Sequence, residues 1–189
     1  SRAKASGADI DMLTPRLNDA ILLVRAMVKQ RYEPMGNQRH GSPGLSEEPF
    51  YATLGKYADY CTSNVPWYNP KSEISAKVIA AFKKRYPNDK PYGHIFNVGF
   101  TFEALLIAAD AYSRAKTSEP KALMAALRAT KIEKHVMVGG PIEFDAKGQN
   151  NNIASVALQN RNLQPTVVLP KEAAQMAPVF PMPGWNNRS

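Results

Sequence analysis

Hydrophobic residues near the start of the chain follow two different spacings. Residues 9–13 form a short run that contains Ile10, Met12 and Leu13, and this run predicts a β-strand. Further on, apolar residues recur three and four positions apart, as on one face of an amphipathic helix: Ala20, Leu23, Val24, Met27 and Val28. Asn18 stands where a helix N-cap is expected, and Asp19 suits the positive end of the helix dipole. The segment therefore predicts a strand, a loop at Thr14–Asn18 and a helix.

The residues before this unit have helical character. Ser1–Ser6 is followed by Gly7, and glycine is common just past the end of a helix. A helix that leads into a strand is typical of a repeating β–α architecture, so the chain is expected to begin inside a domain.

Residues 33–70 predict a second β–α unit and a further strand. Glu33-Pro34 interrupts the helical pattern, because the residue before a proline avoids helical geometry. The expected elements are a short strand at Met35–Gln38, a Gly/Pro/Ser-rich loop at Arg39–Leu45, a helix from a Ser46 cap to about Tyr60 with Glu47 and Glu48 in its first turn, a strand at Thr62–Trp67, and a linker at Trp67–Pro70.

The pattern is helical from residue 71 to residue 132. Ile74, Val78 and Phe82 lie four positions apart on a helix that ends near Tyr86. A long helix is predicted at Gly93–Ala115, and Ser118 begins another, with Leu123, Met124 and Leu127 in its stripe.

Strand patterns return after Met137. The expected elements are a strand at Pro141–Asp145 with Ile142 and Phe144 on one face, a turn at Ala146–Gly148, strands at Ile153–Gln159 and Pro165–Leu169, a hairpin turn at Asn160–Leu163, and a proline-rich tail after Pro170 that wraps the surface or is partly disordered. This order of α/β, helical and β segments predicts two lobes with crossings near 66–70 and 133–141. We expect residues 9–13 and 141–169 to share one sheet.

Composition narrows the classes of function. The 24 basic and 16 acidic residues give a net charge of +8, but the basic residues are dispersed and are not interleaved with aromatic ones, so nucleic-acid binding is not favoured. A single cysteine, Cys61, excludes a disulfide within the chain. No apolar run reaches the roughly 20 residues that a membrane-spanning helix needs.

No pattern in the sequence favours catalysis. His40, His94 and His135 lack the spacing of metal ligands, and His135, which follows Glu133 and Lys134, is interpreted as a surface residue. A nucleophile elbow, a P-loop and a dinucleotide fingerprint are all absent from the sequence. The sequence therefore predicts a protein that is not an enzyme and that uses no cofactor and no metal.

Six stretches in a fixed order carry a resemblance to a known family. They are GADIDMLTPRLNDAILLVRAM, GSPGLSEEPFYATLGKYAD, NPKSEISAKVIAAFKKRYP, FTFEALLIAADAYSRA, EPKALMAALRAT, and GGPIEFDAKGQNNN leading into VALQNRN. In this order they resemble the C-terminal part of bacterial type I periplasmic solute-binding proteins, in the branched-chain amino-acid-binding group that feeds ABC importers. The resemblance extends over about Ala3–Leu169 and depends on the order and spacing of the segments.

The resemblance implies a type I periplasmic binding protein-like fold, which has two lobes, three α/β/α layers and a hinge motion that closes the lobes on a ligand. In that frame the chain is a C-terminal fragment, and the sheet of the first lobe is expected to be missing. The implied domains are residues 1–68 as the α/β portion of the second lobe, 69–136 as the helical portion of the first lobe, 137–170 as strands returning to the second lobe, and 171–189 as a Pro-rich tail.

The implied ligand-binding residues lie in two loops and on one helix. They are Thr14, Arg16, Asn18, Arg39, Ser42 and Phe102. Amino-acid binders of the family usually carry a carboxylate in the second loop, which holds the ligand's ammonium group, whereas Asn37–His40 contains no acid. Arg16 and Arg39 instead suit an anion, because a guanidinium binds a carboxylate through two hydrogen bonds. Two alternatives stay open: both arginines are solvated on loop tips, and Phe102 packs in a core.

The sequence thus predicts a periplasmic substrate-binding component of an ABC importer. Its expected ligand is a small organic anion, such as an aromatic or other carboxylic acid, and its expected partner is the membrane permease of the importer. The alternatives are a ligand-sensing regulatory domain of the same fold, a branched-chain amino-acid binder, and a small basic enzyme or nucleic-acid module.

Overall fold

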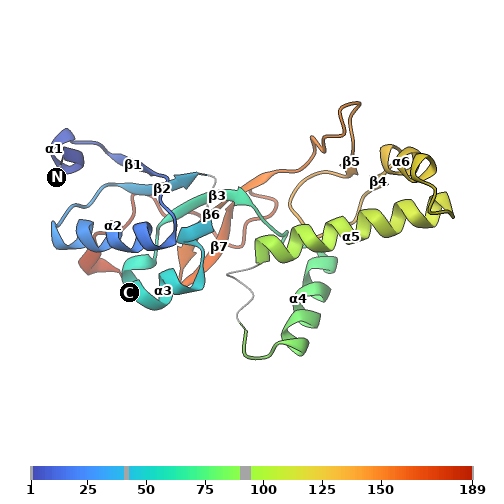
Figure 1. The fold of residues 1–189 in the computed structure, drawn as a ribbon. Coiled ribbons are helices and arrows are strands. Elements are labelled where there is room, and N and C mark those ends of the chain that lie inside the picture. The colour runs from blue at the N-terminus through green and yellow to red at the C-terminus, as the bar shows by residue number, and fades with distance from the viewer. Residues whose placement is uncertain (1, 41–42, 90–94, 189) are drawn as a thin grey trace. The chain divides into compact units, whose positions relative to one another are not determined.

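The computed structural model describes residues 2–40, 43–89 and 95–188, and the chain forms two compact units (Figure 1). Unit 1 comprises Ser1–Val65 and Val156–Ser189, and unit 2 comprises Pro66–Ser155. The chain therefore passes between the units twice. Residues 137–155 group with the helices of unit 2, and the assignment of the units to lobes of a larger protein stays a prediction.

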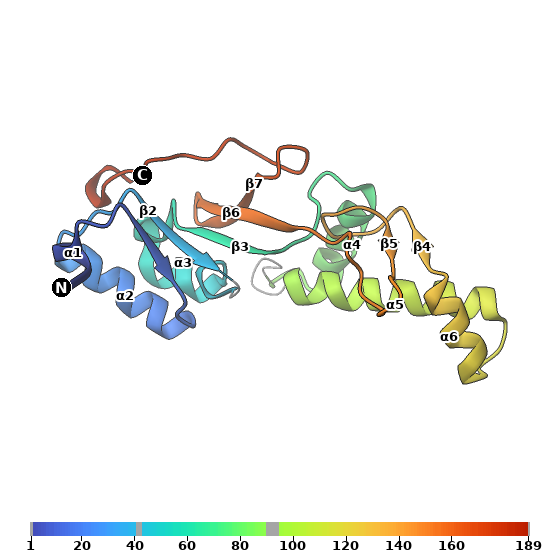
Figure 2. The ribbon, with the colours of Figure 1, turned by 90° about the horizontal axis from the view of Figure 1, so that it is seen from above.

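Unit 1 is built on a five-stranded sheet with the strand order β1-β2-β3-β6-β7 (Figures 1 and 2). Its elements are α1 (Arg2–Ser6), β1 (Ile10–Leu13), α2 (Leu17–Lys29), β2 (Gly36–His40), η1 (Pro43–Leu45), α3 (Glu48–Leu54), η2 (Gly55–Ala58), β3 (Thr62–Pro66), β6 (Ser155–Arg161), β7 (Gln164–Leu169) and η4 (Trp185–Asn187). Strands β1, β2 and β3 are parallel, whereas β6 and β7 are antiparallel. The prediction that residues 9–13 and 141–169 share a sheet is confirmed for β6 and β7, whereas Ile142–Glu143 pairs in a separate two-stranded sheet.

Helices α2 and α3 lie on the same face of this sheet and supply the core of unit 1 (Figure 1). Ala20, Val24 and Met27 are the buried positions of α2, and they have the spacing that the apolar stripe predicts. They pack in one cluster with Phe50 and Leu54 of α3. Burying one side chain of this kind contributes about 1.5–3 kcal/mol, so this cluster stabilises the packing of α2 against α3.

The C-terminal tail wraps unit 1. The Gln159 side chain of β6 both donates to and accepts from the backbone of Val179, at 2.9 Å each way. The Trp185 indole N–H donates to the Tyr32 carbonyl oxygen at 2.7 Å, and the Arg188 guanidinium lies 3.9 Å from the Trp185 ring centroid. These contacts bury Trp185 and Arg188, so of the two alternatives for the tail, wrapping is confirmed.

The helix predicted from Ser46 to about Tyr60 is shorter and starts later. Glu47, with extended backbone angles, is the residue before α3, and Ser46 is buried, so the predicted Ser46 cap is wrong. Pro49 explains the shift, because its fixed φ and missing N–H suit the first turn of a helix. Gly55, at φ 54°, ends α3, and the 3₁₀ turn η2 follows it.

Unit 2 contains three helices and a two-stranded ribbon among its described residues. They are α4 (Glu73–Arg85), α5 (Ile95–Ala115), α6 (Pro120–Arg128), β4 (Lys131–Ile132) and β5 (Ile142–Glu143). Figure 2 shows α6 packed near the end of α5. The cap of α6 is Glu119, whose carboxylate accepts from the amides of Lys121 and Ala122, and the predicted start at Ser118 is one residue early.

The predicted strand at Pro141–Asp145 is reduced to two residues. Asp145 accepts hydrogen bonds from the backbone N–H groups of Lys147 and Gln149, and these bonds turn the chain after Phe144. Among the residues that the structure describes, no helix combines the length and apolar character that crossing a membrane requires.

Gly139 is expected to tolerate no side chain. Its φ is 150°, and an added Cβ would lie 2.5 Å from the Asn152 carbonyl oxygen and 3.0 Å from the Ile153 Cα atom. Because both neighbours are backbone atoms, Gly139→Ala should lower the free energy of unfolding by about 2–4 kcal/mol in denaturant melts of the intact protein. Gly148→Ala is the matched control, since Gly148 has φ 79° with no atom within 4 Å of an added Cβ. It should cost only about 1 kcal/mol, and equal losses in the two variants would contradict this explanation.

Candidate functional site

The carboxyl ends of three parallel strands meet at one edge of unit 1. In the sheet register Leu13 of β1 pairs with Arg39 of β2, and Arg39 pairs with Ser63 of β3. Thr14 therefore follows β1 at the same edge at which β2 ends with His40. In open α/β sheets, ligands bind outside this edge, beside the helix N-termini. The edge is therefore the first candidate site in unit 1.

The N-terminus of α2 begins at this edge. Arg16 is the N-cap residue with φ −77° and ψ 174°, and its carbonyl oxygen accepts from the Ala20 amide at 2.9 Å. The Arg16 side chain makes no capping hydrogen bond to the helix. The predicted Asn18 cap is wrong, because Asn18 is already the second helical residue, and Asp19 lies in the first turn. The helix end therefore presents backbone N–H groups and the positive end of the dipole beside an exposed arginine.

The structure brings only some of the predicted site residues together. Thr14, Arg16 and Asn18 are exposed in one short stretch. Arg39 is placed in β2, but its side chain lies outside the described part of the structure, as does Ser42 altogether. Phe102 is a half-buried residue of α5 and belongs to unit 2. Binding by these six residues stays a prediction.

The segment Asn37–His40 was expected to face a ligand, but the structure buries its first residue, Asn37, in the core. Asn37 is fully buried, and its side-chain amide lies 3.8 Å from the Met27 sulfur of α2. Because side chains alternate along a strand, Gln38 belongs to the opposite face of the sheet. Asn37 is therefore a core residue.

Unit 2 contains a buried ion pair that the sequence interpretation missed. Glu103 of α5 and His135 are only 5% and 8% exposed, and the Glu103 Oε1 atom lies 2.7 Å from the His135 Nδ1 atom. The interpretation of His135 as a surface residue is wrong. The pKa of His135 is raised above its ordinary value, first by the hydrogen bond to Glu103, while burial acts in the opposite direction. A signal was present in the sequence, because Glu103 is the only charged residue in the apolar run of α5 from residue 95 to residue 109.

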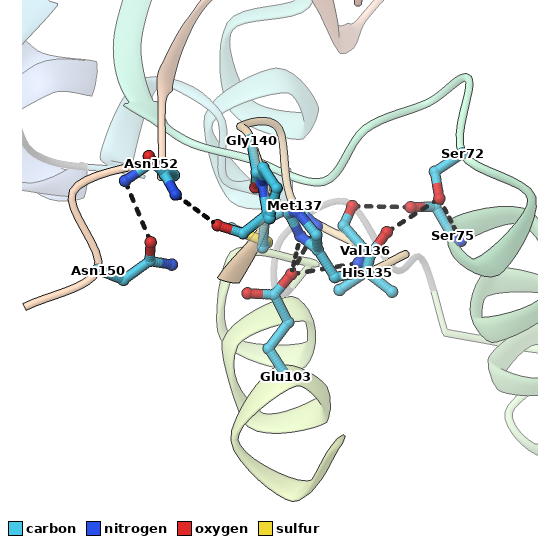
Figure 3. Close-up of polar contacts among 10 residues, drawn as sticks. Ser72, Ser75, Glu103, His135, Val136, Met137, Gly140, Asn150 and Asn152 are labelled. Atoms are coloured by element: carbon cyan, nitrogen blue, oxygen red, sulfur yellow. Dashed lines mark hydrogen bonds and ion pairs between the residues drawn. The ribbon is translucent and has the colours of Figure 1, made fainter. Parts of the chain in front are cut away.

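The Glu103 carboxylate also binds the backbone next to His135 (Figure 3). Its Oε1 atom accepts from the amides of Val136 at 3.2 Å and Met137 at 2.9 Å. The second ring nitrogen of His135 lies 2.8 Å from the Gly140 carbonyl oxygen. One carboxylate oxygen and one imidazole therefore connect helix α5 to the segment 135–140.

Helix α4 holds the same segment from its N-terminal turn (Figure 3). The Ser72 hydroxyl donates to the His135 carbonyl oxygen at 3.0 Å, and the Ser75 hydroxyl donates to the Val136 carbonyl oxygen at 2.8 Å. Ser72 also caps α4 by accepting from the Ser75 amide. The polar groups of this buried region are thus used to position backbone.

Among the described residues, no group of three His, Cys, Asp or Glu side chains lies close enough together to hold a metal ion. The lone Cys61 is buried, and burial raises the pKa of its thiol, which makes it a poor nucleophile.

Comparisons with known proteins agree with this architecture. A family model described as periplasmic binding protein matches residues 1–161. No curated protein matches the sequence.

Similar solved structures include a branched-chain amino acid ABC transporter protein of Silicibacter pomeroyi (TM-score 0.77, 15% identity, covering 97% of this chain and 49% of that one). They also include a leucine-binding protein of Thermotoga maritima (TM-score 0.69, 14% identity, 88% and 45% covered) and a branched-chain amino acid ABC transporter protein of Thermus thermophilus with bound valine (TM-score 0.68, 12% identity, 88% and 46% covered). The chain spans about half the length of these proteins, and at such identities the likeness shows the fold alone.

The buried pair gives a stability prediction. Glu103→Gln should lower the free energy of unfolding by about 1.5–3 kcal/mol, because a hydrogen-bonded charge is replaced by a neutral amide of the same shape. Glu103→Ala should cost about 3–5 kcal/mol, since it leaves His135 and two amides without their acceptor.

The control for these variants is Glu143→Gln, which removes an exposed ion pair at 3.3 Å from Lys131. It should change stability by less than about 1 kcal/mol. Urea melts of the intact protein measure all three variants, and a Glu103→Gln loss no larger than the control would contradict the buried-pair explanation.

Proposed function

This chain belongs to the periplasmic binding protein family, and on that premise we propose that it is part of the substrate-binding component of an ABC importer, located in the periplasm. Unit 1 then corresponds to most of the second lobe, and unit 2 corresponds to the C-terminal helices of the first lobe. The chain's span of about half the length of its structural relatives supports this division. The partner is the membrane permease, to which the loaded protein delivers its solute.

The proposed solute is a small organic anion, such as an aromatic or other carboxylic acid. The observation that carries this proposal is Arg16, an exposed guanidinium at the N-terminus of α2 and at the carboxyl end of β1. An anion there meets a bidentate donor, free backbone N–H groups and the positive end of the helix dipole together. Thr14, Asn18, Arg39 and Ser42 complete the proposed contacts from the second lobe, and Phe102 contributes from the first.

The lack of an acid at Asn37–His40 supports the same choice. A ligand ammonium needs a carboxylate partner once it is desolvated in a cleft, because an unpaired buried charge is costly. Asn37 of this segment packs in the core, and the other three residues, Gln38, Arg39 and His40, include no acid. A cation is therefore poorly matched to it.

Two alternatives remain within the same fold. A branched-chain amino-acid binder is favoured by the names of the structural relatives, one of which holds valine. A ligand-sensing regulatory domain is the other, and the complete reading frame distinguishes it, because an exported protein is made with a secretory signal peptide. A purely binding role, without catalysis, is proposed for all three.

The ligand class can be tested by a thermal-shift screen of the intact protein. A ligand that binds only the folded state raises the apparent melting temperature, by an amount equivalent to about 2.7 kcal/mol at a hundred times its Kd. Aromatic and aliphatic carboxylic acids without an amine should give the largest shifts. Large shifts with leucine or valine, and none with these acids, would refute the anion proposal and favour the amino-acid binder.

Arg16 is expected to contribute to binding and not to folding. Arg16→Ala should weaken binding of the best acid from the screen by about tenfold to a hundredfold, because a desolvated guanidinium–carboxylate contact is a charge-assisted bond of about 1.5–3 kcal/mol. Its stability without ligand should change by less than about 0.5 kcal/mol. Titration calorimetry and urea melts measure the two quantities.

The matched control is Arg25→Ala, which removes an exposed arginine from the middle of the same helix. It should leave affinity unchanged. Equal affinities of wild type and Arg16→Ala would make Arg16 a solvated loop residue, and a large loss of stability without ligand would make it structural.

A further inference from the structure

Three extended segments of unit 2 lie side by side next to the places where the chain leaves the unit. They are residues 67–69, 136–140 and 152–154, and backbone hydrogen bonds join the middle segment to each of the other two. Towards residues 67–69, the Val138 amide donates to the Trp67 oxygen at 2.9 Å, and the Val136 oxygen accepts from the Asn69 amide at 2.6 Å. Towards residues 152–154, the Gly140 amide donates to the Asn152 oxygen at 2.9 Å, and the Val138 oxygen accepts from the Ala154 amide at 3.1 Å. The outer segments continue directly into the two crossings, after Val65 and before Val156. Whatever fixes the middle segment therefore also fixes both crossings.

The middle segment is fixed by the pair of Glu103 and His135. Glu103 accepts from His135 and from the amides of Val136 and Met137, and the far side of the His135 ring reaches the Gly140 oxygen (Figure 3). Helix α5 packs closely here, because a Cβ on Gly99 would lie 2.6 Å from the Met137 sulfur. The segment is thus held at both of its ends by one ionisable pair.

The arrangement requires a proton that a neutral histidine does not have. Both ring nitrogens of His135 face acceptors, one a carboxylate and the other a carbonyl oxygen. A neutral imidazole carries a single N–H group. After His135 loses a proton, one of its ring nitrogens therefore presents a lone pair to an acceptor oxygen, and that hydrogen bond is lost. The Glu103 Oε1 atom accepts two backbone N–H bonds besides, so it faces the His135 Nδ1 atom as a hydrogen-bond acceptor.

Other charged groups near the pair are exposed. Glu73 of α4, Glu133 and Lys134 line the same cleft as His135, and solvent screens all three. Asp145 and Lys147, in the loop after Gly140, are exposed as well. Glu103 is therefore the dominant charge acting on His135 among the described residues.

We propose that the Glu103–His135 pair is a proton-dependent clamp on the two crossings: the protonated pair holds residues 135–140 in place, and release of the His135 proton to solvent loosens that segment and its neighbours. The sign follows from linkage. The pKa of His135 is raised in the folded protein, so the clamp is fully formed below the ordinary histidine pKa and is lost as the pH rises through the raised value. This device goes beyond the proposed function and does not depend on any solute.

Amide hydrogen exchange of the intact protein, followed by NMR between about pH 6 and about pH 9, tests the clamp. As the pH rises, the protection factors of the amides of Asn69, Val138, Gly140 and Ala154 should fall. The expected fall is about tenfold for each pH unit by which the pKa of His135 exceeds its ordinary value. In unit 1 the Tyr60 amide donates to the Asn160 oxygen and the Asn160 amide donates to the Cys61 oxygen, and these two amides should show no such step. Constant protection at the four amides, or an equal fall in unit 1, would overturn the proposal.

Two variants and one titration separate the clamp from a merely structural role. Glu103→Gln should abolish the pH step, whereas Glu133→Gln, which alters an exposed acid of the same cleft, should keep it. A step that persists in Glu103→Gln would overturn the proposal. The NMR titration of the His135 ring in the wild type needs no variant to fold: a midpoint above the ordinary histidine value is expected, and one at or below it would also overturn the proposal.

Discussion

The parallel register of β1, β2 and β3 is the constraint on which the binding proposal depends. Parallel pairing brings the carboxyl ends of all three strands to one edge, and α2 starts from that edge as soon as β1 ends. The core between α2 and α3 then fixes the helix against the sheet. Apolar packing on its inner face therefore fixes the position of α2, and the proposed ligand contacts lie at its exposed N-terminal end.

A different principle governs unit 2, in which short extended segments depend on buried polar groups. One carboxylate oxygen of Glu103 satisfies an imidazole and two amides, and two serines of α4 satisfy the next two carbonyl groups. A network of this kind is stable only when every member is paired, so it is sensitive to the loss of one proton. The same sensitivity is the basis of the proposed clamp on the crossings, whereas a purely apolar contact would respond little to pH.

Much of the fold follows from patterns that the sequence displays openly. The apolar stripe of α2, the four-residue spacing of Ile74, Val78 and Phe82, and the hairpin around Asn162 each have a local physical cause. The starts of α3 and α6 were harder to predict, because a serine precedes each helix and suggests a cap. Pro49 sets the start of α3 by its backbone geometry, and Glu119 sets the start of α6 by capping it. The role of His135 could not be found from its neighbours in sequence, since its partner lies 32 positions away and only folding brings the two together. Glu103, alone among apolar residues, was the available signal.

The central claim is that a carboxylate binds at the edge where β1 meets α2. A crystal structure of the intact protein with the carboxylic acid that stabilises it most tests this directly. We expect the ligand's carboxylate to lie within hydrogen-bonding distance of the Arg16 guanidinium and of the first backbone amides of α2. A ligand bound elsewhere, or an ammonium group held at this edge by an acidic side chain, would contradict it.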